Sequence, residues 1–111
     1  MLTTTREKKS ARRASTSLTV ALLKGDALYV LETANVSGGG LCLRSNEEFP
    51  VGTHLHLVFG RPPELSRLSV NGIVRWSKSG KGVGVEFTSI SPHDQQALLS
   101  FVNSQTRDQQ A

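Results

Sequence analysis

The sequence predicts an all-β domain with one C-terminal helix, in the form of a six-stranded antiparallel β-barrel. Three observations lead to this fold class. Apolar residues alternate with other side chains along six short runs, which is the period of a strand with one buried face. Turn-forming residues separate these runs. The apolar period changes to that of a helix only once, near the C-terminal end.

The chain has 111 residues, which is enough to fold as one domain without metal or disulfide support. We divide it into a flexible basic N-terminal arm at residues 1–16, a barrel with its helix at residues 17–104 and a polar tail at residues 105–111. Cys42 is the only cysteine, so neither an internal disulfide nor a thiolate metal centre is expected. Because the sequence shows no secretory signal and no apolar run long enough to span a membrane, a cytoplasmic location is expected.

The first two strands are expected at residues 18–23 and 28–36, joined as a hairpin by the turn residues 24–26. A polar, glycine-rich hexapeptide, Asn-Val-Ser-Gly-Gly-Gly, then occupies residues 35–40. Glycine accepts positive φ and lets other groups approach the backbone, while short Asn and Ser side chains offer hydrogen-bonding atoms. The hexapeptide therefore predicts a turn, and its residues alone are compatible both with an ordinary turn and with a binding turn.

The remaining strands are expected at residues 40–44, 54–59, 68–77 and 83–87. Residues 60–64 are expected to form a loop, because their paired prolines cannot donate to a strand ladder. Gly72 in the middle of the fifth strand predicts a bulge or a sharp bend. If the alternation is strict, one face of that strand consists of Leu68, Val70, Gly72, Val74 and Trp76.

A helix is expected from Ser91 onward. Ser91 is suited to cap the helix, Pro92 to occupy its first turn, and Asp94 to stand three residues after the cap. The apolar stripe of this helix consists of Leu98, Leu99, Phe101 and Val102. We expect the stripe to cover an open end or face of the sheet.

The net charge of +4 comes entirely from the N-terminal arm. Residues 1–16 contain five basic side chains and one acid, whereas the rest of the chain has eight of each. Such an arm attracts phosphate groups on nucleic acid, on an anionic membrane surface or on a small nucleotide. A solubilising disordered tail is the alternative.

The sequence favours a binding module over an enzyme. It contains no motif for a metalloprotease, a phosphate-gripping loop or a paired nucleophile and base. His54 and His56 have the spacing of metal ligands on one strand face but no third ligand beside them, so we expect surface histidines and no metal site. The aromatic residues are scattered instead of forming a stacking face, so only the basic arm argues for a nucleic-acid partner.

A resemblance to the PilZ domain, a bacterial receptor for cyclic di-GMP, extends from about Lys8 to Val102. The hexapeptide contains the family's Asp/Asn-x-Ser-x-x-Gly motif as Asn35, Ser37 and Gly40. Later segments also resemble the family: Gly-Ile-Val-Arg-Trp at residues 72–76, Gly-Val-Gly-Val-Glu-Phe at residues 82–87 and the Ser-Pro helix start at residues 91–92.

The family's other motif, Arg-x-x-x-Arg before the first strand, is present here only in altered form. One register pairs Lys9 with Arg13, and the neighbouring register pairs Lys8 with Arg12. Lysine keeps the positive charge of arginine but lacks its planar, bidentate fork. The motif therefore departs from the family pattern in both registers.

The resemblance implies a non-catalytic cyclic di-GMP receptor or adaptor, with a partner protein that reads the bound state. The implied ligand contacts are Lys9, Arg12, Arg13, Asn35, Ser37 and Gly40, with a second group comprising Lys8, Gly39, Arg44 and Trp76. No cofactor is expected beyond this ligand, and both a monomer and a homodimer remain open. The first alternative is a PilZ-like protein-interaction module that does not bind cyclic di-GMP, and the second is a nucleic-acid binder acting through the basic arm.

Overall fold

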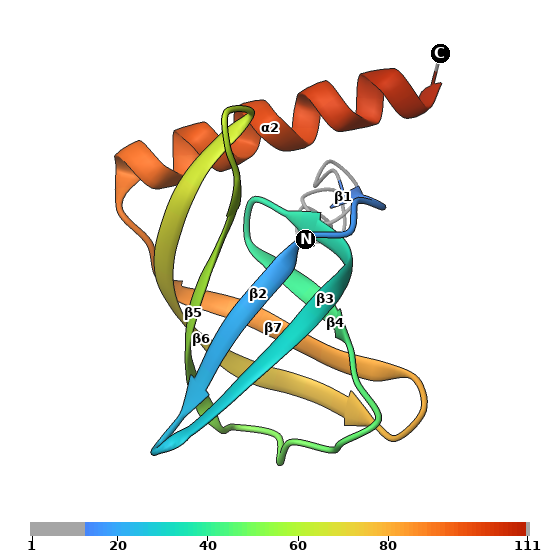
Figure 1. The fold of residues 1–111 in the computed structure, drawn as a ribbon, viewed down its shortest axis with the longest axis vertical. Coiled ribbons are helices and arrows are strands. Elements are labelled where there is room, and N and C mark those ends of the chain that lie inside the picture. The colour runs from blue at the N-terminus through green and yellow to red at the C-terminus, as the bar shows by residue number, and fades with distance from the viewer. Residues whose placement is uncertain (1–12, 111) are drawn as a thin grey trace, which may run out of the picture.

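The computed structural model describes residues 13–110, which form seven strands and one helix (Figure 1). In chain order the elements are β1 (Arg13–Ala14), β2 (Thr19–Lys24), β3 (Ala27–Ser37), β4 (Gly40–Arg44), β5 (His54–Arg61), β6 (Leu65–Lys78), β7 (Gly82–Ser89) and α2 (Pro92–Gln110).

Six of the strands form a closed antiparallel barrel, which confirms the predicted fold class. Hydrogen-bonded neighbours follow the order β3, β2, β5, β6, β7 and β4, and the pairing of β4 with β3 closes the ring. Strand β3 is long enough to pair with two neighbours: its first half pairs with β2 and its second half pairs with β4. The two-residue strand β1 pairs with the end of β3, opposite Val36 and Ser37.

The hydrophobic core lies inside the barrel and consists of the side chains that point inward from the alternating strands. Its fully buried members include Leu22, Leu57, Val70 and Val83, from four different strands. Phe49, from the segment between β4 and β5, adds a large side chain that meets the ring of Tyr29 edge to face at a centroid distance of 5.2 Å. The predicted alternation thus identifies most of the core.

The connection between β5 and β6 is shorter than the sequence predicts. Gly60 and Arg61 belong to β5, and Arg61 pairs with Leu65 across a turn of three residues. A proline favours an extended conformation in the residue before it, so Arg61 can still pair in the ladder. The predicted loop is therefore wrong for residues 60–61.

The bulge or bend predicted at Gly72 corresponds to a register shift in the strand pairing. The pairing of β6 with β7 shifts between Asn71 and Gly72. A Cβ atom at Gly72 would lie 2.6 Å from Val85 Cγ1, so a side chain here would collide with the core. The absent side chain lets the two strands approach closely at the bend.

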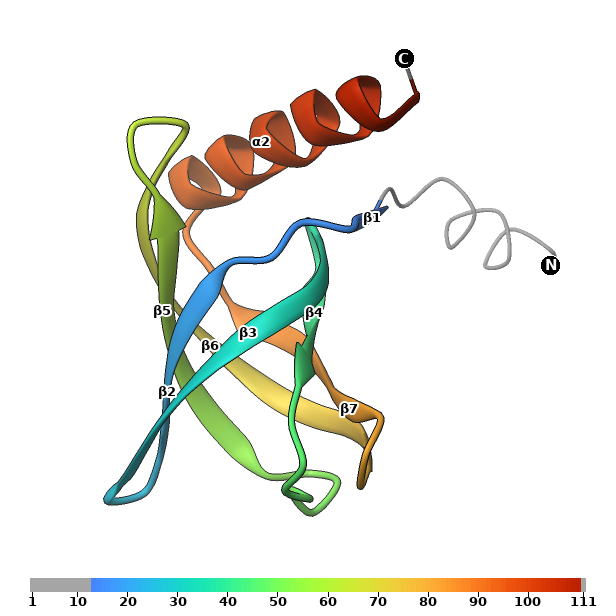
Figure 2. The same cartoon turned by 45° about the vertical axis from the view of Figure 1, so that its right-hand side comes forward.

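Helix α2 crosses one end of the barrel (Figures 1 and 2). Ser91 caps it as predicted, since its hydroxyl accepts a hydrogen bond from the amide of Asp94 at 3.1 Å. The helix continues to Gln110, so the segment that the sequence assigns to a polar tail is helical over residues 105–110. Within the described residues, no helix is apolar enough over its length to cross a membrane.

Residues 13–16 are packed against the barrel, although the sequence assigns them to the arm. Ala14 is fully buried, and the carbonyl of Thr16 accepts a hydrogen bond from the Thr33 hydroxyl at 2.5 Å. The Thr16 hydroxyl in turn donates to Gln105 Oε1 of α2 at 3.1 Å. The boundary between arm and barrel therefore lies before Arg13, and residues 1–12 lie outside the described part of the chain.

Candidate functional site

The candidate site is built around the hairpin between β3 and β4. Only Gly38 and Gly39 form its turn, because β3 extends through Ser37 and β4 begins at Gly40. The predicted turn is therefore shorter than the hexapeptide. The Ser37 hydroxyl donates to the carbonyl of Gly40 at 3.2 Å and accepts from the amide of Gly39 at 3.3 Å. These bonds hold the polar group of Ser37 at the mouth of the turn.

Two of the three glycines at this hairpin, Gly38 and Gly40, allow close packing. None of them has a positive φ angle. A Cβ atom at Gly40 would lie 2.2 Å from the carbonyl oxygen of Val85, and one at Gly38 would lie 2.4 Å from Leu99 Cδ2 of α2. A Cβ atom at Gly39 would meet nothing within 4 Å. Of the two uses of glycine that the sequence offers here, close approach of other groups is found at Gly38 and Gly40, and positive φ is not used.

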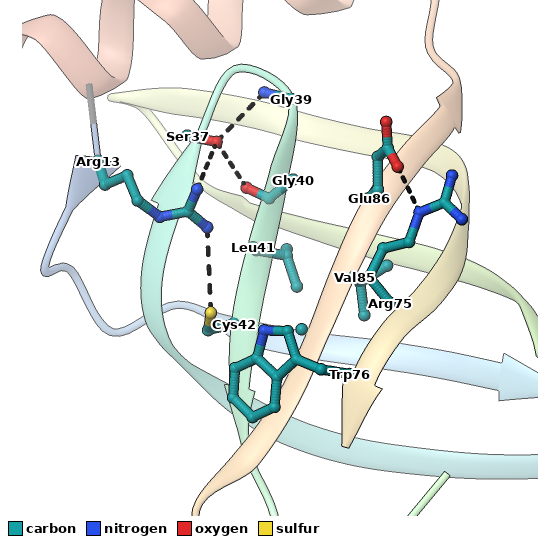
Figure 3. A pocket seen from close by; sticks show the side chains of 11 residues that line it. Arg13, Ser37, Gly39, Gly40, Leu41, Cys42, Arg75, Trp76, Val85 and Glu86 are labelled. Atoms are coloured by element: carbon teal, nitrogen blue, oxygen red, sulfur yellow. Dashed lines mark hydrogen bonds and ion pairs between the residues drawn. The ribbon is translucent and has the colours of Figure 1, made fainter. Parts of the chain in front are cut away.

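Arg13 brings the N-terminal segment to the hairpin. Strand pairing places Arg13 opposite Ser37. Its guanidinium donates from Nε to Asn35 Oδ1 at 2.7 Å. It also donates from Nη1 to the Ser37 hydroxyl at 3.4 Å, and Nη2 lies 4.0 Å from Cys42 Sγ (Figure 3). One cationic side chain therefore contacts both polar residues that the hexapeptide supplies.

A cavity of about 330 Å³ opens on the outer face of the barrel beside Arg13 (Figure 3). The hairpin forms one wall of it, and strands β6 and β7 form the other. The lining residues are Arg13, Ser37, Gly39, Gly40, Leu41, Cys42, Arg75, Trp76, Gly84, Val85 and Glu86. The cavity is open to solvent and combines cationic, anionic, aromatic and backbone groups.

Comparison with protein families decides the classification. The family model described as PilZ domain matches residues 7–104. The chain belongs to the PilZ domain family. This match confirms the resemblance seen in the sequence. A search of curated proteins gives no significant match.

Three solved structures show the same fold. MotI/DgrA, an inhibitor of motility from Bacillus subtilis, has a TM-score of 0.77 at 24% identity over 89% of this chain; the chain spans only 51% of that protein. The PilZ domain of YcgR from Escherichia coli, solved with c-di-GMP, has a TM-score of 0.71 at 12% identity over 91% of this chain and 93% of its own. The PilZ domain of CeSA from a cellulose-synthesizing bacterium has a TM-score of 0.64 at 14% identity, covering 83% of this chain and 95% of its own.

Trp76 lines the cavity of this PilZ domain because of a bulge in β6. The pairing of β6 with β7 joins Val74 to Val85 and Trp76 to Gly84, which leaves Arg75 as an extra residue. The bulge shifts the alternation, so that Arg75 and Trp76 are both exposed while Val74 is buried. The prediction that Trp76 shares one face of this strand with Leu68, Val70, Gly72 and Val74 is wrong.

The indole of Trp76 lies directly against the backbone of Gly84. A Cβ atom at Gly84 would be 2.0 Å from Trp76 Nε1 and 2.5 Å from Cδ1. The indole therefore keeps its place only while residue 84 has no side chain. Because the indole is 43% exposed, one side of the ring remains available to a ligand.

Replacing Gly84 by alanine is expected to push the indole off β7 and into solvent. Trp76 is the only tryptophan, so intrinsic fluorescence reports on this ring alone. The emission maximum of Gly84→Ala should shift to longer wavelength than that of the native protein. Gly39→Ala, where an added Cβ meets open space, is the matched control. An unchanged emission maximum in Gly84→Ala would contradict the contact between the ring and the backbone.

The wall formed by β6 and β7 also contains an ion pair that the sequence did not indicate. Arg75 Nε lies 2.5 Å from Glu86 Oε1, and both side chains are about half exposed. The strand alternation, which turns Gly84 and Glu86 away from the core, is the signal that would have found Glu86. The alternation in β6 likewise turns Arg75 away from buried Val74, so the same signal applies to Arg75.

The structure brings together only part of the predicted ligand set. Arg13, Ser37, Gly39, Gly40 and Trp76 line the cavity. Asn35 contacts Arg13 without lining the cavity. The structure describes the chain from residue 13 onward, so the predicted contacts Lys8, Lys9 and Arg12 lie outside the described residues.

Arg44 has a different environment from the one predicted. It is opposite Glu32 in the pairing of β3 with β4, and it does not line the cavity. The pKa of Glu32 lies below its ordinary value because the Ser17 hydroxyl and then the Thr19 hydroxyl donate to its carboxylate, and Arg44 adds a smaller electrostatic attraction. The structure therefore associates Arg44 with this acidic group.

No group of three potential metal ligands is found among the described residues. His56 is held by hydrogen bonds at both ring nitrogens. Nδ1 lies 2.8 Å from Asn71 Oδ1, and Nε2 lies 2.7 Å from the Ser69 hydroxyl. These contacts fix the ring on the outer face of the barrel.

Proposed function

We propose that this PilZ domain is a non-catalytic receptor for cyclic di-GMP, which binds at the cavity beside the β3–β4 hairpin. The observation that carries the proposal is the placement of the Arg13 guanidinium against Asn35 and Ser37 at the cavity wall. This contact joins the N-terminal basic segment to the Asn-x-Ser-x-x-Gly motif.

The chemistry of the site suits a nucleotide with two phosphates. A guanidinium has five N–H groups, and the contacts to Asn35, Ser37 and Cys42 use three of them. The remaining groups can donate to a phosphate oxygen or to the acceptor edge of a guanine. The exposed indole of Trp76 offers a flat surface on which a base can stack. The similarity in fold to the YcgR domain solved with c-di-GMP supports the same ligand class.

Ligand binding would be communicated to other proteins by a change at the surface of the domain. Ligand contacts at Arg13 would act on β1 and on the residues that follow it, where Thr16 donates to Gln105 of α2. Gln95 of α2 also donates to the carbonyl of Gly38 in the hairpin turn at 3.3 Å. A cytoplasmic partner protein that recognises this surface would read the bound state.

Calorimetric titration with cyclic di-GMP tests the receptor function. Cyclic di-AMP, which has the same charge and ring size, is the control ligand, and duplex DNA at low and high salt tests the nucleic-acid alternative. We expect saturable binding of cyclic di-GMP and none of DNA at high salt. DNA binding alone would favour the basic arm as a nucleic-acid contact. The absence of binding in every titration would leave the protein-interaction module as the function.

Lys9→Arg is expected to strengthen cyclic di-GMP binding. If Lys9 occupies the first arginine position of the family motif, arginine there adds a directed hydrogen bond, worth about 1 kcal/mol or roughly fivefold in affinity. The same titration measures the gain, and Lys8→Arg is the control for the alternative register. A gain in Lys8→Arg without one in Lys9→Arg would move the register by one residue and make Arg12 the second partner.

A further inference from the structure

The cavity has two walls of opposite chemical character. On the hairpin side, Arg13 presents N–H donors. On the side of β6 and β7, the carboxylate of Glu86 presents only acceptors (Figure 3). The register places Glu86 opposite Gly40, the last residue of the binding motif. A ligand that fills the cavity would therefore meet donors from one side and an acceptor from the other.

Arg75 is a diagonal neighbour of Glu86 on the outer face of the sheet. Ile73 pairs with Glu86 and Arg75 lies two residues further along β6, so the side chain of Arg75 can reach the carboxylate. Only one oxygen of Glu86 is used, since Arg75 Nε contacts Oε1. A carboxylate has about four acceptor positions, so most of its capacity remains available. The cation of Arg75 also offsets the negative charge that would otherwise repel a phosphate-bearing ligand.

We infer that Glu86, held in place by Arg75, is the residue that selects guanine at this site. This inference rests on the proposed function. Guanine carries two neighbouring donors, N1–H and the N2 amino group, on the edge that a carboxylate can accept. Hypoxanthine lacks the N2 amino group, and adenine has an acceptor at N1. A carboxylate therefore favours guanine over both of the other bases.

The discrimination is expected to be moderate in size. A hydrogen bond to a charged group is typically worth about 1.5–3 kcal/mol, which corresponds to roughly 10- to 100-fold in affinity. The side chain of Glu86 is 54% exposed, so water competes for the same contact. We therefore expect the native protein to bind cyclic di-GMP roughly tenfold more tightly than cyclic di-inosine monophosphate.

The test compares the ratio of these two affinities in the native protein and in Glu86→Ala. Both ligands carry the same charge, so any general effect of removing an acid cancels in the ratio. We expect the ratio to fall from roughly tenfold to near one in Glu86→Ala. Glu86→Gln, which keeps one acceptor and the shape of the side chain, should give an intermediate ratio. Glu64→Ala, in the turn between β5 and β6, is the matched control and should keep the native ratio.

The outcomes separate this inference from the proposed function. If the native protein binds cyclic di-GMP but Glu86→Ala keeps the full ratio, another residue reads the N2 amino group and the role of Glu86 is overturned. If the native protein binds neither cyclic dinucleotide, the proposed function fails and the inference fails with it. Far-UV circular dichroism checks that each variant is folded, and Glu86→Gln provides the result if the alanine variant is not.

Discussion

Gly40→Ala is expected to lower the free energy of unfolding by about 3 kcal/mol, at the upper end of the usual cost of overpacking. The added Cβ would lie 2.2 Å from the carbonyl oxygen of Val85 and 3.2 Å from Glu86 Cα. Both are backbone atoms of β7, so no side-chain rotation can relieve the contact. Relief requires β4 and β7 to separate where Gly40 pairs with Glu86 and Leu41 with Val85, and this pairing belongs to the barrel itself.

Gly39→Ala is the matched control, because it adds the same methyl group one residue away. Its Cβ would meet nothing within 4 Å, and the backbone there has no positive φ. The change in unfolding free energy should stay within about 0.5 kcal/mol. Urea denaturation followed by circular dichroism measures both variants. Equal midpoints for Gly40→Ala and Gly39→Ala would contradict the close approach of β4 and β7.

The barrel could be predicted because strand alternation and turn residues are local signals. Leu22, Leu57 and Val83 are buried as the period-two pattern requires. Strand ends were less predictable, since pairing across the sheet decides them. Arg61 pairs with Leu65 although it precedes two prolines, and the terminal helix continues past residue 104 although its last residues are polar. In the helix, the burial of Thr106 shows that tertiary packing extends into that polar segment.

The candidate site could be predicted only where its residues follow a sequence motif. Ser37 and Gly40 belong to such a motif, and both line the cavity. The positions of Asn35 and Trp76 depend on bulges, which shift the side of the sheet that each following residue faces. A bulge between Thr33 and Asn35 reverses the alternation within β3, and one between Val74 and Trp76 does the same in β6. Neither bulge has a marker such as the mid-strand glycine at position 72.

Arg13 is expected to be the largest single contributor to cyclic di-GMP affinity among the described residues. Arg13→Ala removes a cation that contacts Asn35 and Ser37 at the cavity wall. Loss of a charge-assisted contact is worth about 1.5–3 kcal/mol, and the loss of preorganisation at Ser37 adds to it. We expect roughly 30- to 100-fold weaker binding, measured by calorimetric titration.

Arg13→Lys separates geometry from charge. Lysine keeps the positive charge but lacks the planar guanidinium of arginine. It therefore cannot donate to Asn35 and Ser37 in that geometry and bind a ligand at the same time. If the fork positions the ligand, Arg13→Lys should lose most of the affinity that Arg13→Ala loses. A double-mutant cycle with Ser37→Ala should then give a coupling energy above about 0.5 kcal/mol, because the two side chains act on the ligand as one unit. Full affinity in Arg13→Lys, with additive effects in the cycle, would instead show that position 13 contributes charge alone.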